Sequence, residues 1–146
     1  MKTQISTTPE QSQRLIACGV NPDSADMVWQ ESLTLYGKRR NEIFLLIRDD
    51  DHEFRTTDTP AWSLSALLDL LPTEIKIDGY TYRISIYFEN HDEPVIGNQW
   101  CLYYKPKKHN EKSRIDDVTM YSTDLIQCSV LMIEWLTSNG YTLNTK

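Results

Sequence analysis

The chain has few of the residue patterns on which catalysis and metal binding depend. Its three cysteines, Cys18, Cys101 and Cys128, form no CxxC pair and lie among apolar neighbours, so we expect reduced core thiols without a redox or metal role. Its five glycines form no GxGxxG or GxxxxGK phosphate-binding loop, and no serine lies in a GxSxG turn. The sequence therefore argues against an enzyme, and we expect no cofactor.

The chain also lacks a long apolar run. No segment approaches the roughly 20 consecutive apolar residues of a membrane span, and the opening residues MKTQISTTPEQSQ contain no apolar core of a secretion signal. The formal net charge is -6, which disfavours attraction to a nucleic acid or to an anionic membrane. We therefore expect a cytoplasmic protein that does not bind membranes.

The residues that are present indicate one folded domain. Hydrophobic residues make up 40% of the 146 residues, and four tryptophans and eight tyrosines supply bulky core side chains. A chain of this length can bury one sizeable core. No repeat, low-complexity tract or linker divides it, so we expect a single α+β domain over residues 1–146.

Two segments in the first half carry complete helix signals. Residues 8–11, TPEQ, form a capping-box start with proline at the first helical position, and Gly19 ends that helix. Residues 60–72, PAWSLSALLDLLP, predict a short buried helix with leucines at helical spacing, because Ser63 is a good N-cap and Pro72 prevents continuation.

The last predicted helix, over residues 122–139, is apolar on nearly all sides. Its polar positions form only a narrow strip of Gln127, Glu134 and Ser138, and Gly140 follows its end. Such a helix is either central, between a sheet and the other helices, or buried on one flank against a partner such as a second copy of the chain.

The strand signals are strongest in the middle of the chain. Apolar and polar residues alternate on both sides of a two-residue Asp78-Gly79 turn, which predicts a hairpin, and a third strand over 99–105 extends it to an antiparallel meander. The cross-strand pairs predicted by this turn are Ile75 with Tyr82 and Ile77 with Tyr80.

Two further strands are predicted before the leucine helix. Residues 32–36 and 43–48 flank a polar turn at 37–42, and the second run contains IFLLI, which is apolar on both faces and indicates a strand inside a sheet. The expected fold is thus α+β, with one antiparallel sheet of about five strands and two to three helices on one face, the C-terminal helix being central.

The remaining segments are expected to be irregular or helical. A helical start at Asn21 is expected to continue for about two turns and to include Val28. Residues 49–60 are expected to form a loop, and residues 105–120 a charged connection before the last helix.

Residues 49–53, DDDHE, are the strongest metal candidate by composition. They lack the alternating ligands, central glycine and distal glutamate of an EF-hand, so we expect a solvated acidic loop and no metal. His91 and His109 lie in polar segments without a partner at fixed spacing and are expected at the surface. An enzyme whose site assembles only in three dimensions, around His52 or His91, is the third function class.

A basic cluster follows the third strand of the meander. Its members are Lys105, Lys107, Lys108, Lys112 and Arg114. We interpret this cluster as a solvated loop, since the negative net charge opposes binding to a polyanion. A nucleic-acid-binding accessory factor is the alternative function, and it requires the cluster to converge with residues 38–40 on one face.

Three aromatic residues are candidates for a protein-binding surface. Tyr87 and Tyr103 fall on the polar faces of their strands, so their rings are candidates for exposure on the outer side of the sheet. Trp62 either lies partly exposed near the same surface or packs down as a hydrophobic staple, and we favour packing because tryptophan is highly buried on average.

Three blocks of the sequence carry a resemblance to known proteins. They are EQSQRLIACGVNPDSADM at 10–27, TPAWSLSALLDLLP at 59–72 and DLIQCSVLMIEWLTSNGY at 124–141. In this order they resemble a family of small uncharacterised proteins from prophages and other mobile elements of gut bacteria. The resemblance implies an intracellular accessory protein of mobile-element origin and assigns no catalytic residue. We therefore expect a non-catalytic module that binds a host or element-encoded protein.

Overall fold

The computed structural model describes residues 4–33, 39–49, 53–89, 98–108 and 118–144. Over these ranges the protein is α+β, as the sequence predicts, with two antiparallel sheets and three α-helices. The elements in chain order are α1 (Pro9–Ala17), the 3-10 helix η1 (Pro22–Ser24), β1 (Met27–Leu33), β2 (Arg39–Ile47), β3 (Thr59–Ala61), α2 (Leu64–Leu70), β4 (Glu74–Ile77), β5 (Tyr80–Glu89), β6 (Gln99–Pro106), β7 (Val118–Ser122) and α3 (Leu125–Ser138).

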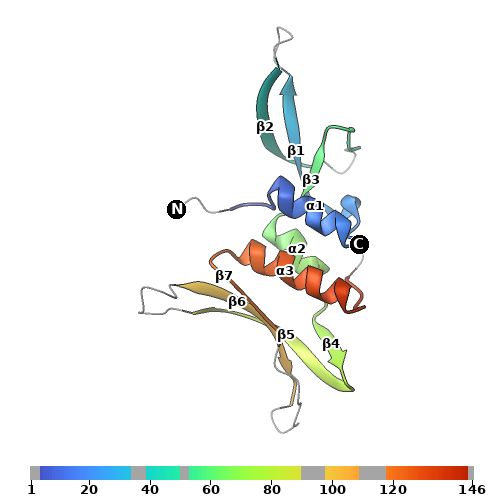
Figure 1. Ribbon diagram of the computed structural model, residues 1–146, viewed down its shortest axis with the longest axis vertical. Helices are drawn as coiled ribbons and strands as arrows, with labels where there is room; N and C mark the ends of the chain where they lie inside the picture. The colour runs from blue at the N-terminus through green and yellow to red at the C-terminus, as the bar shows by residue number, and fades with distance from the viewer. Residues whose placement is uncertain (1–3, 34–38, 50–52, 90–97, 109–117, 145–146) are drawn as a thin grey trace.

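The helices form a middle layer between the two sheets (Figure 1). The three-stranded sheet has the order β2-β1-β3, and the four-stranded sheet is a meander in the order β4-β5-β6-β7. Helix α3 contacts β6 and β7 on one side and α1 and α2 on the other. The C-terminal helix is therefore central, as predicted, and its apolar flanks are covered within one chain.

Both predicted helix starts are present. The Thr8 side chain accepts a hydrogen bond from the Gln11 backbone N–H, and the Gln11 side chain accepts one from the Thr8 N–H, which completes the capping box of α1. Ser63 caps α2 through the Ala66 N–H, and the buried face of α2 includes Leu67. Local sequence chemistry thus fixes where these helices begin.

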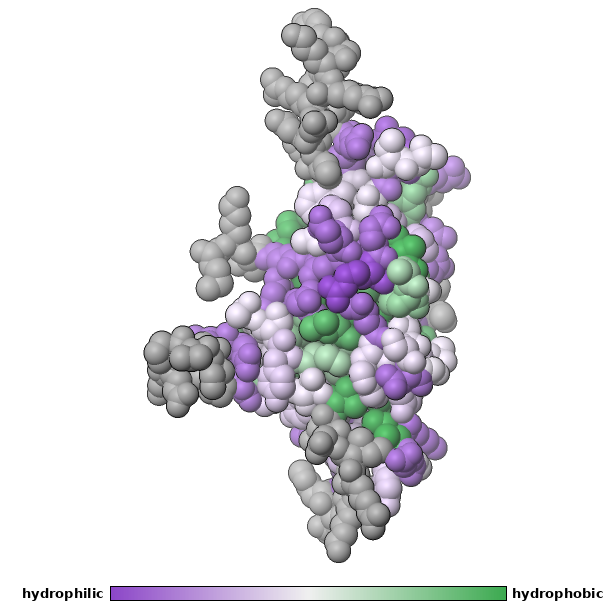
Figure 2. Space-filling view, viewed as in Figure 1, coloured by the Kyte–Doolittle hydropathy of each residue, from purple (hydrophilic) through white to green (hydrophobic). Residues whose placement is uncertain are grey.

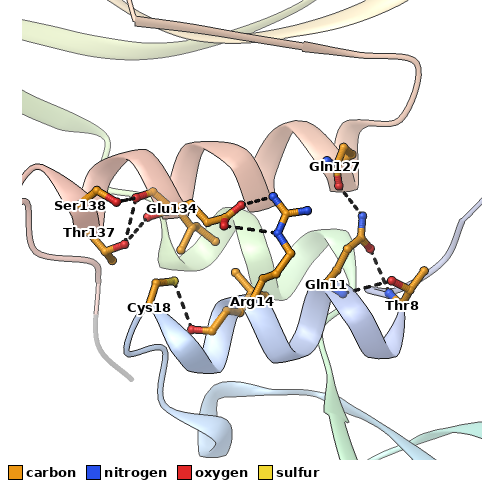
Figure 3. Close-up of polar contacts among 10 residues, drawn as sticks. Thr8, Gln11, Arg14, Cys18, Gln127, Glu134, Thr137 and Ser138 are labelled. Carbon is orange, nitrogen blue, oxygen red and sulfur yellow. Dashed lines mark hydrogen bonds and ion pairs between the residues drawn. The ribbon is translucent and has the colours of Figure 1, made fainter.

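The polar strip of α3 faces α1 and not only solvent (Figure 3). The Gln11 amide donates a hydrogen bond to the Gln127 side-chain oxygen, with 2.6 Å between the two atoms. Arg14 forms a charge-assisted contact with Glu134 through two of its nitrogens. Beyond these contacts the outward face of α1 is hydrophilic, as Figure 2 shows. The strip therefore orients α1 on α3.

The register of the central hairpin is the one that its turn predicts. Ile75 pairs with Tyr82 and Ile77 with Tyr80. Asp78 and Gly79 both have positive φ, 50° and 84°, as a type I′ turn requires, and glycine adopts such a φ without strain.

The first sheet differs from the prediction in the bounds and in the number of its strands. The segment 27–33 is strand β1, so the predicted helix from Asn21 stops after one 3-10 turn. A short strand, β3, lies within the predicted loop 49–60, and it pairs with β1. The sheet total is therefore seven strands in two sheets over the described residues, where about five in one sheet were expected.

The prediction that the IFLLI run lies inside a sheet is wrong. It belongs to β2, which is the edge of the three-stranded sheet, and Leu46 and Ile47 are 45% and 81% exposed. The hairpin of β1 and β2 projects away from the helix layer, so none of the described helices packs over this strand (Figure 1). The burial of β2 is thus decided by where the strand lies in the tertiary structure and not by its apolar sequence.

Candidate interaction surface

The four-stranded sheet has one covered and one open face. Leu102 and Tyr104 of β6 and Tyr82 of β5 point toward the helices and are fully buried. Because side chains alternate along a strand, the odd-numbered residues of β5, β6 and β7 lie on the opposite face. In Figure 1 the helices cover only one side of this sheet.

Three tyrosines from adjacent strands lie on the open face, and we call them the tyrosine surface: Tyr87, Tyr103 and Tyr121. Tyr87 and Tyr121 are 41% and 50% exposed, and Tyr103 is half-buried. The rings of Tyr87 and Tyr103 meet edge to face with their centroids 5.3 Å apart. The structure thus places together the two tyrosines that the sequence selected, and adds Tyr121.

Cys101 forms the floor of the tyrosine surface. It pairs with Tyr87 on one side and Tyr121 on the other, and it is fully buried although it points to the open face. This burial raises the pKa of the Cys101 thiol. The Tyr87 hydroxyl donates a hydrogen bond to Glu89, whose carboxylate raises the pKa of that hydroxyl. Both groups are therefore neutral at physiological pH and act by shape and hydrogen bonding.

Basic residues border one end of the tyrosine surface. Arg83 and Lys107 both contact the Glu74 carboxylate, each with 3.2 Å between the charged atoms. The hydrogen bond from Lys107, followed by that from Arg83, lowers the pKa of Glu74. Lys105 lies on the same face, opposite Arg83. Glu74 thus contacts two cations and Lys105 adds a third on the same face, so this end of the face is positively charged within a chain whose net charge is -6.

Trp62 does not belong to this surface. Its side chain is fully buried, its indole N–H donates to the Ser24 hydroxyl at 2.9 Å, and its backbone N–H donates to the Thr7 hydroxyl at 3.0 Å. The packing interpretation describes Trp62, and its candidacy as an exposed contact is wrong. In the interior its ring is fully packed and its indole N–H has a hydrogen-bond acceptor.

The basic cluster is only partly within the described residues. Lys105, Lys107 and Lys108 lie at the end of β6, whereas Lys112 and Arg114 are outside the described ranges, as is Lys38. The hairpin of β1 and β2, where β2 begins at Arg39, lies at the opposite end of the molecule from β6 (Figure 1). The described basic segments therefore do not converge on one face.

The other predicted sites fall largely outside the described residues. Residues 50–52, His91 and His109 lie outside them, and within the described ranges no three metal-binding side chains form a group. A hollow of about 110 Å³ opens between α2 and the residues that follow α1. It is lined by Gly19, Val20, Asn21, Ser24, Leu70, Leu143 and Asn144, none of which is titratable. This hollow gives the enzyme alternative no acid–base pair.

Sequence reasoning missed Tyr121 because β7 was assigned to a charged connection. Its five residues, Val118–Ser122, alternate in the way of a strand, with Val118 and Met120 against the core and Tyr121 on the open face. That short alternation was the available signal. The charged residues before it dominate the composition of 105–120, and they favour a connection over a strand.

Comparison with protein-family models, with curated proteins and with solved structures finds no match for this chain. Among the described helices, none has the length and apolar character needed to cross a membrane.

Proposed function

We propose that this protein is a non-catalytic interaction module that binds another protein through the tyrosine surface. The observation that carries the proposal is the gathering of Tyr87, Tyr103 and Tyr121 on the open face of the four-stranded sheet. Tyrosine is enriched at protein interfaces, because its ring gives apolar contact area at low entropy cost and its hydroxyl can form a hydrogen bond with water or with a group of the partner.

The resemblance of the three sequence blocks adds the biological setting of this proposal. We propose an accessory protein of phage or mobile-element origin that acts in the cytoplasm on a host or element-encoded protein. The positively charged border of the tyrosine surface, formed by Arg83, Lys105 and Lys107, favours a partner with acidic residues beside an apolar patch.

Affinity capture of the tagged protein from its native cell tests the proposal. We expect a stoichiometric protein partner that survives nuclease treatment and moderate salt. The triple variant Tyr87→Ala, Tyr103→Ala, Tyr121→Ala should lose it, because these rings supply the central contact area. Ile47→Ala is the matched control, since Ile47 is a large exposed side chain on the other sheet. Unchanged capture by the triple variant would overturn the proposal.

A nucleic-acid-binding accessory factor is the second candidate. The observation that favours it is the same border, because cations beside tyrosines on an open sheet suit phosphate contacts and base stacking. Titration with labelled single-stranded DNA or RNA at two salt concentrations separates the candidates. Nucleic-acid binding should weaken steeply as the salt concentration rises, and Lys105→Ala and Lys107→Ala should reduce it. Both results together would support this candidate against the first.

A further inference from the structure

Strand β5 has an unfinished edge. Strand β4 covers only its first half, because the pairing begins at Ile77 with Tyr80 and ends at Glu74 with Arg83. The last contact on this edge is the hydrogen bond from the Ile84 N–H to the Thr73 carbonyl, at 3.0 Å. Residues 85–89 continue as strand and pair with β6 on the other side only, as far as the described residues show.

Backbone geometry shows which groups are left on this edge. The Ile84 N–H points toward β4, and the Thr81 carbonyl, an odd-numbered position, accepts from Lys107 on the β6 side. Since N–H and C=O groups alternate sides along a strand, Ile86 and Phe88 direct their backbone groups to the open edge. No described residue bonds them there.

Large side chains are exposed along the same stretch. Ile86, Tyr87 and Phe88 are 41%, 41% and 48% exposed. Ile86 and Phe88 lie on the face that carries the core, but α3 packs mainly over β6 and β7, and both side chains stay largely exposed. An apolar strand edge with free backbone groups is a template for pairing with another strand.

We propose that this edge pairs with the same edge of a second copy of the chain, in an antiparallel register centred on Tyr87. In this register Ile86 lies opposite Phe88 of the second copy, and the reverse holds by symmetry. Both residues have backbone groups that point across the edge, so each such pair forms two hydrogen bonds. The two four-stranded sheets would then form one continuous sheet with two-fold symmetry.

Charge and length both favour a second copy as the occupant. Glu89 would lie opposite Ser85 of the second copy and diagonal to its Arg83, which belongs to the positively charged end of the face. On this edge, Ser85 to Phe88 have no described backbone partner, and β5 ends at Glu89, which is the partner of Ser85 in this register. Strand β5 of the second copy therefore ends just before the position at which Thr73 bonds Ile84, so the two do not compete for the edge.

The proposed dimer does not depend on the proposed function, but it would enlarge the tyrosine surface. The two-fold axis is perpendicular to the sheet, so both open faces lie on the same side. Tyr87 of one copy would lie opposite Tyr87 of the other, and the two tyrosine surfaces would be continuous. A partner would then meet one surface of doubled area, which raises its avidity without any new contact.

Sedimentation analysis from about 10 μM to about 1 mM tests the dimer, because so short an edge predicts weak association. We expect a concentration-dependent mass between monomer and dimer. Ile86→Lys should raise the dissociation constant at least about tenfold, since it removes two apolar pairs from each dimer. Ile47→Lys is the control at an exposed edge of the other sheet and should leave the constant unchanged. A monomer throughout, or a dimer that Ile86→Lys leaves intact, would overturn the proposal.

A charge exchange tests the register. Within one chain Arg83 and Glu89 are six residues apart, about 20 Å along the strand, so they cannot pair there. Glu89→Arg and Arg83→Glu should each weaken the dimer, and the double variant should restore part of the loss. No restoration, in a dimer that both single changes weaken, would exclude this register.

Cysteine cross-linking gives a second readout of the register in a Cys18→Ser, Cys101→Ala background, because Cys101 lies directly opposite position 87 within the chain and would compete for the new cysteine. Two copies of Tyr87→Cys would lie directly opposite, about 4.5 Å apart at Cα, which a disulfide can span. Ser85→Cys is the control, because its two copies would be about 13 Å apart along the strands. Oxidation should cross-link the first variant and not the second, and equal cross-linking of both would contradict the register.

Discussion

Two buried tyrosines on the covered face of the four-stranded sheet differ in one hydrogen bond. The Tyr104 hydroxyl donates to the Pro72 carbonyl at 2.6 Å, and burial raises its pKa. The Tyr82 hydroxyl is equally buried but has no hydrogen-bond partner among the described residues. A buried hydroxyl without a partner costs free energy, whereas a bonded one contributes.

This difference predicts opposite effects of the same change. Tyr104→Phe should lower the free energy of unfolding by about 1–2 kcal/mol, because it also leaves the Pro72 carbonyl unbonded. Tyr82→Phe should leave that free energy unchanged or raise it. Urea unfolding followed by circular dichroism compares the two variants. Equal losses in both would mean that the Tyr82 hydroxyl has a partner in solution.

Cys128 predicts a loss of stability at alkaline pH. Burial raises the pKa of its thiol from 9.0 to about 11, so the folded state holds this proton over a range where the unfolded state releases it. The contribution is intact below pH 9.0 and is lost as pH rises toward about 11. Unfolding measured from pH 8 to pH 10.5 should show a shallower decline for Cys128→Ala than for the natural chain. Parallel declines would show that this thiol titrates alike in both states.

At the scale of elements, α2 shows how far a helical pattern determines burial. Leu67 and Leu68 are consecutive leucines of the same helix, yet Leu67 is fully buried and Leu68 only half-buried. The sequence alone predicts that aspartate at either position prevents folding. The structure separates the two positions, because they point to different sides of the helix.

We therefore predict that Leu67→Asp prevents soluble folding and that Leu68→Asp does not. An unpaired carboxylate in the core costs several kcal/mol, against a total stability of about 5–15 kcal/mol. At the half-buried position the carboxylate can reach water, so a lower melting temperature is expected instead. Soluble yield and thermal unfolding measure both effects. A folded Leu67→Asp protein would show that this face of α2 is not the buried one.

The elements that the sequence predicted well are those fixed by neighbouring residues. The capping box of α1, the cap of α2 and the register around Asp78-Gly79 each depend on residues close in the chain. The end of α2 shows the opposite case. Asn144 donates from its side chain to the Asp69 and Leu71 carbonyls and from its backbone to Leu70, contacts over more than 70 residues that no local pattern indicates.

The tyrosine surface also has one part that depends on local sequence and one part that depends on tertiary packing. Alternation along β5 and β6 places Tyr87 and Tyr103 on one face, so the sequence could select them. Whether that face is covered depends on where the helices pack, which is a tertiary property. The unfinished edge of β5 arises because β4 begins only at Glu74, opposite Arg83, and no feature of β5 itself indicates that its second half lacks a described neighbour.

At the scale of the whole molecule, the two sheets differ in their relation to the core. The core cluster draws on the helices and on β4, β5 and β6. The first sheet meets the rest of the molecule through β3, which contacts α1, and through Thr7. The Thr7 N–H donates to the Trp62 carbonyl, its hydroxyl accepts from the Trp62 N–H, and its carbonyl accepts from the Trp29 indole. Among the described side chains of β2, none belongs to the core cluster.

This asymmetry predicts that the hairpin of β1 and β2 opens without global unfolding. Native-state hydrogen exchange should give backbone amides of β2 protection at least about 100-fold below those of β6, because local opening of β2 exposes little buried apolar surface. Amides of β6, between β5 and β7 and under α3, should exchange only through global unfolding. Mild destabilisation by Leu68→Asp provides the control: it should lower the protection of β6 in proportion to stability and leave β2 unchanged. If β2 and β6 instead lost protection together, the two sheets would form one cooperative unit and the shared helix layer would couple them more strongly than their packing indicates.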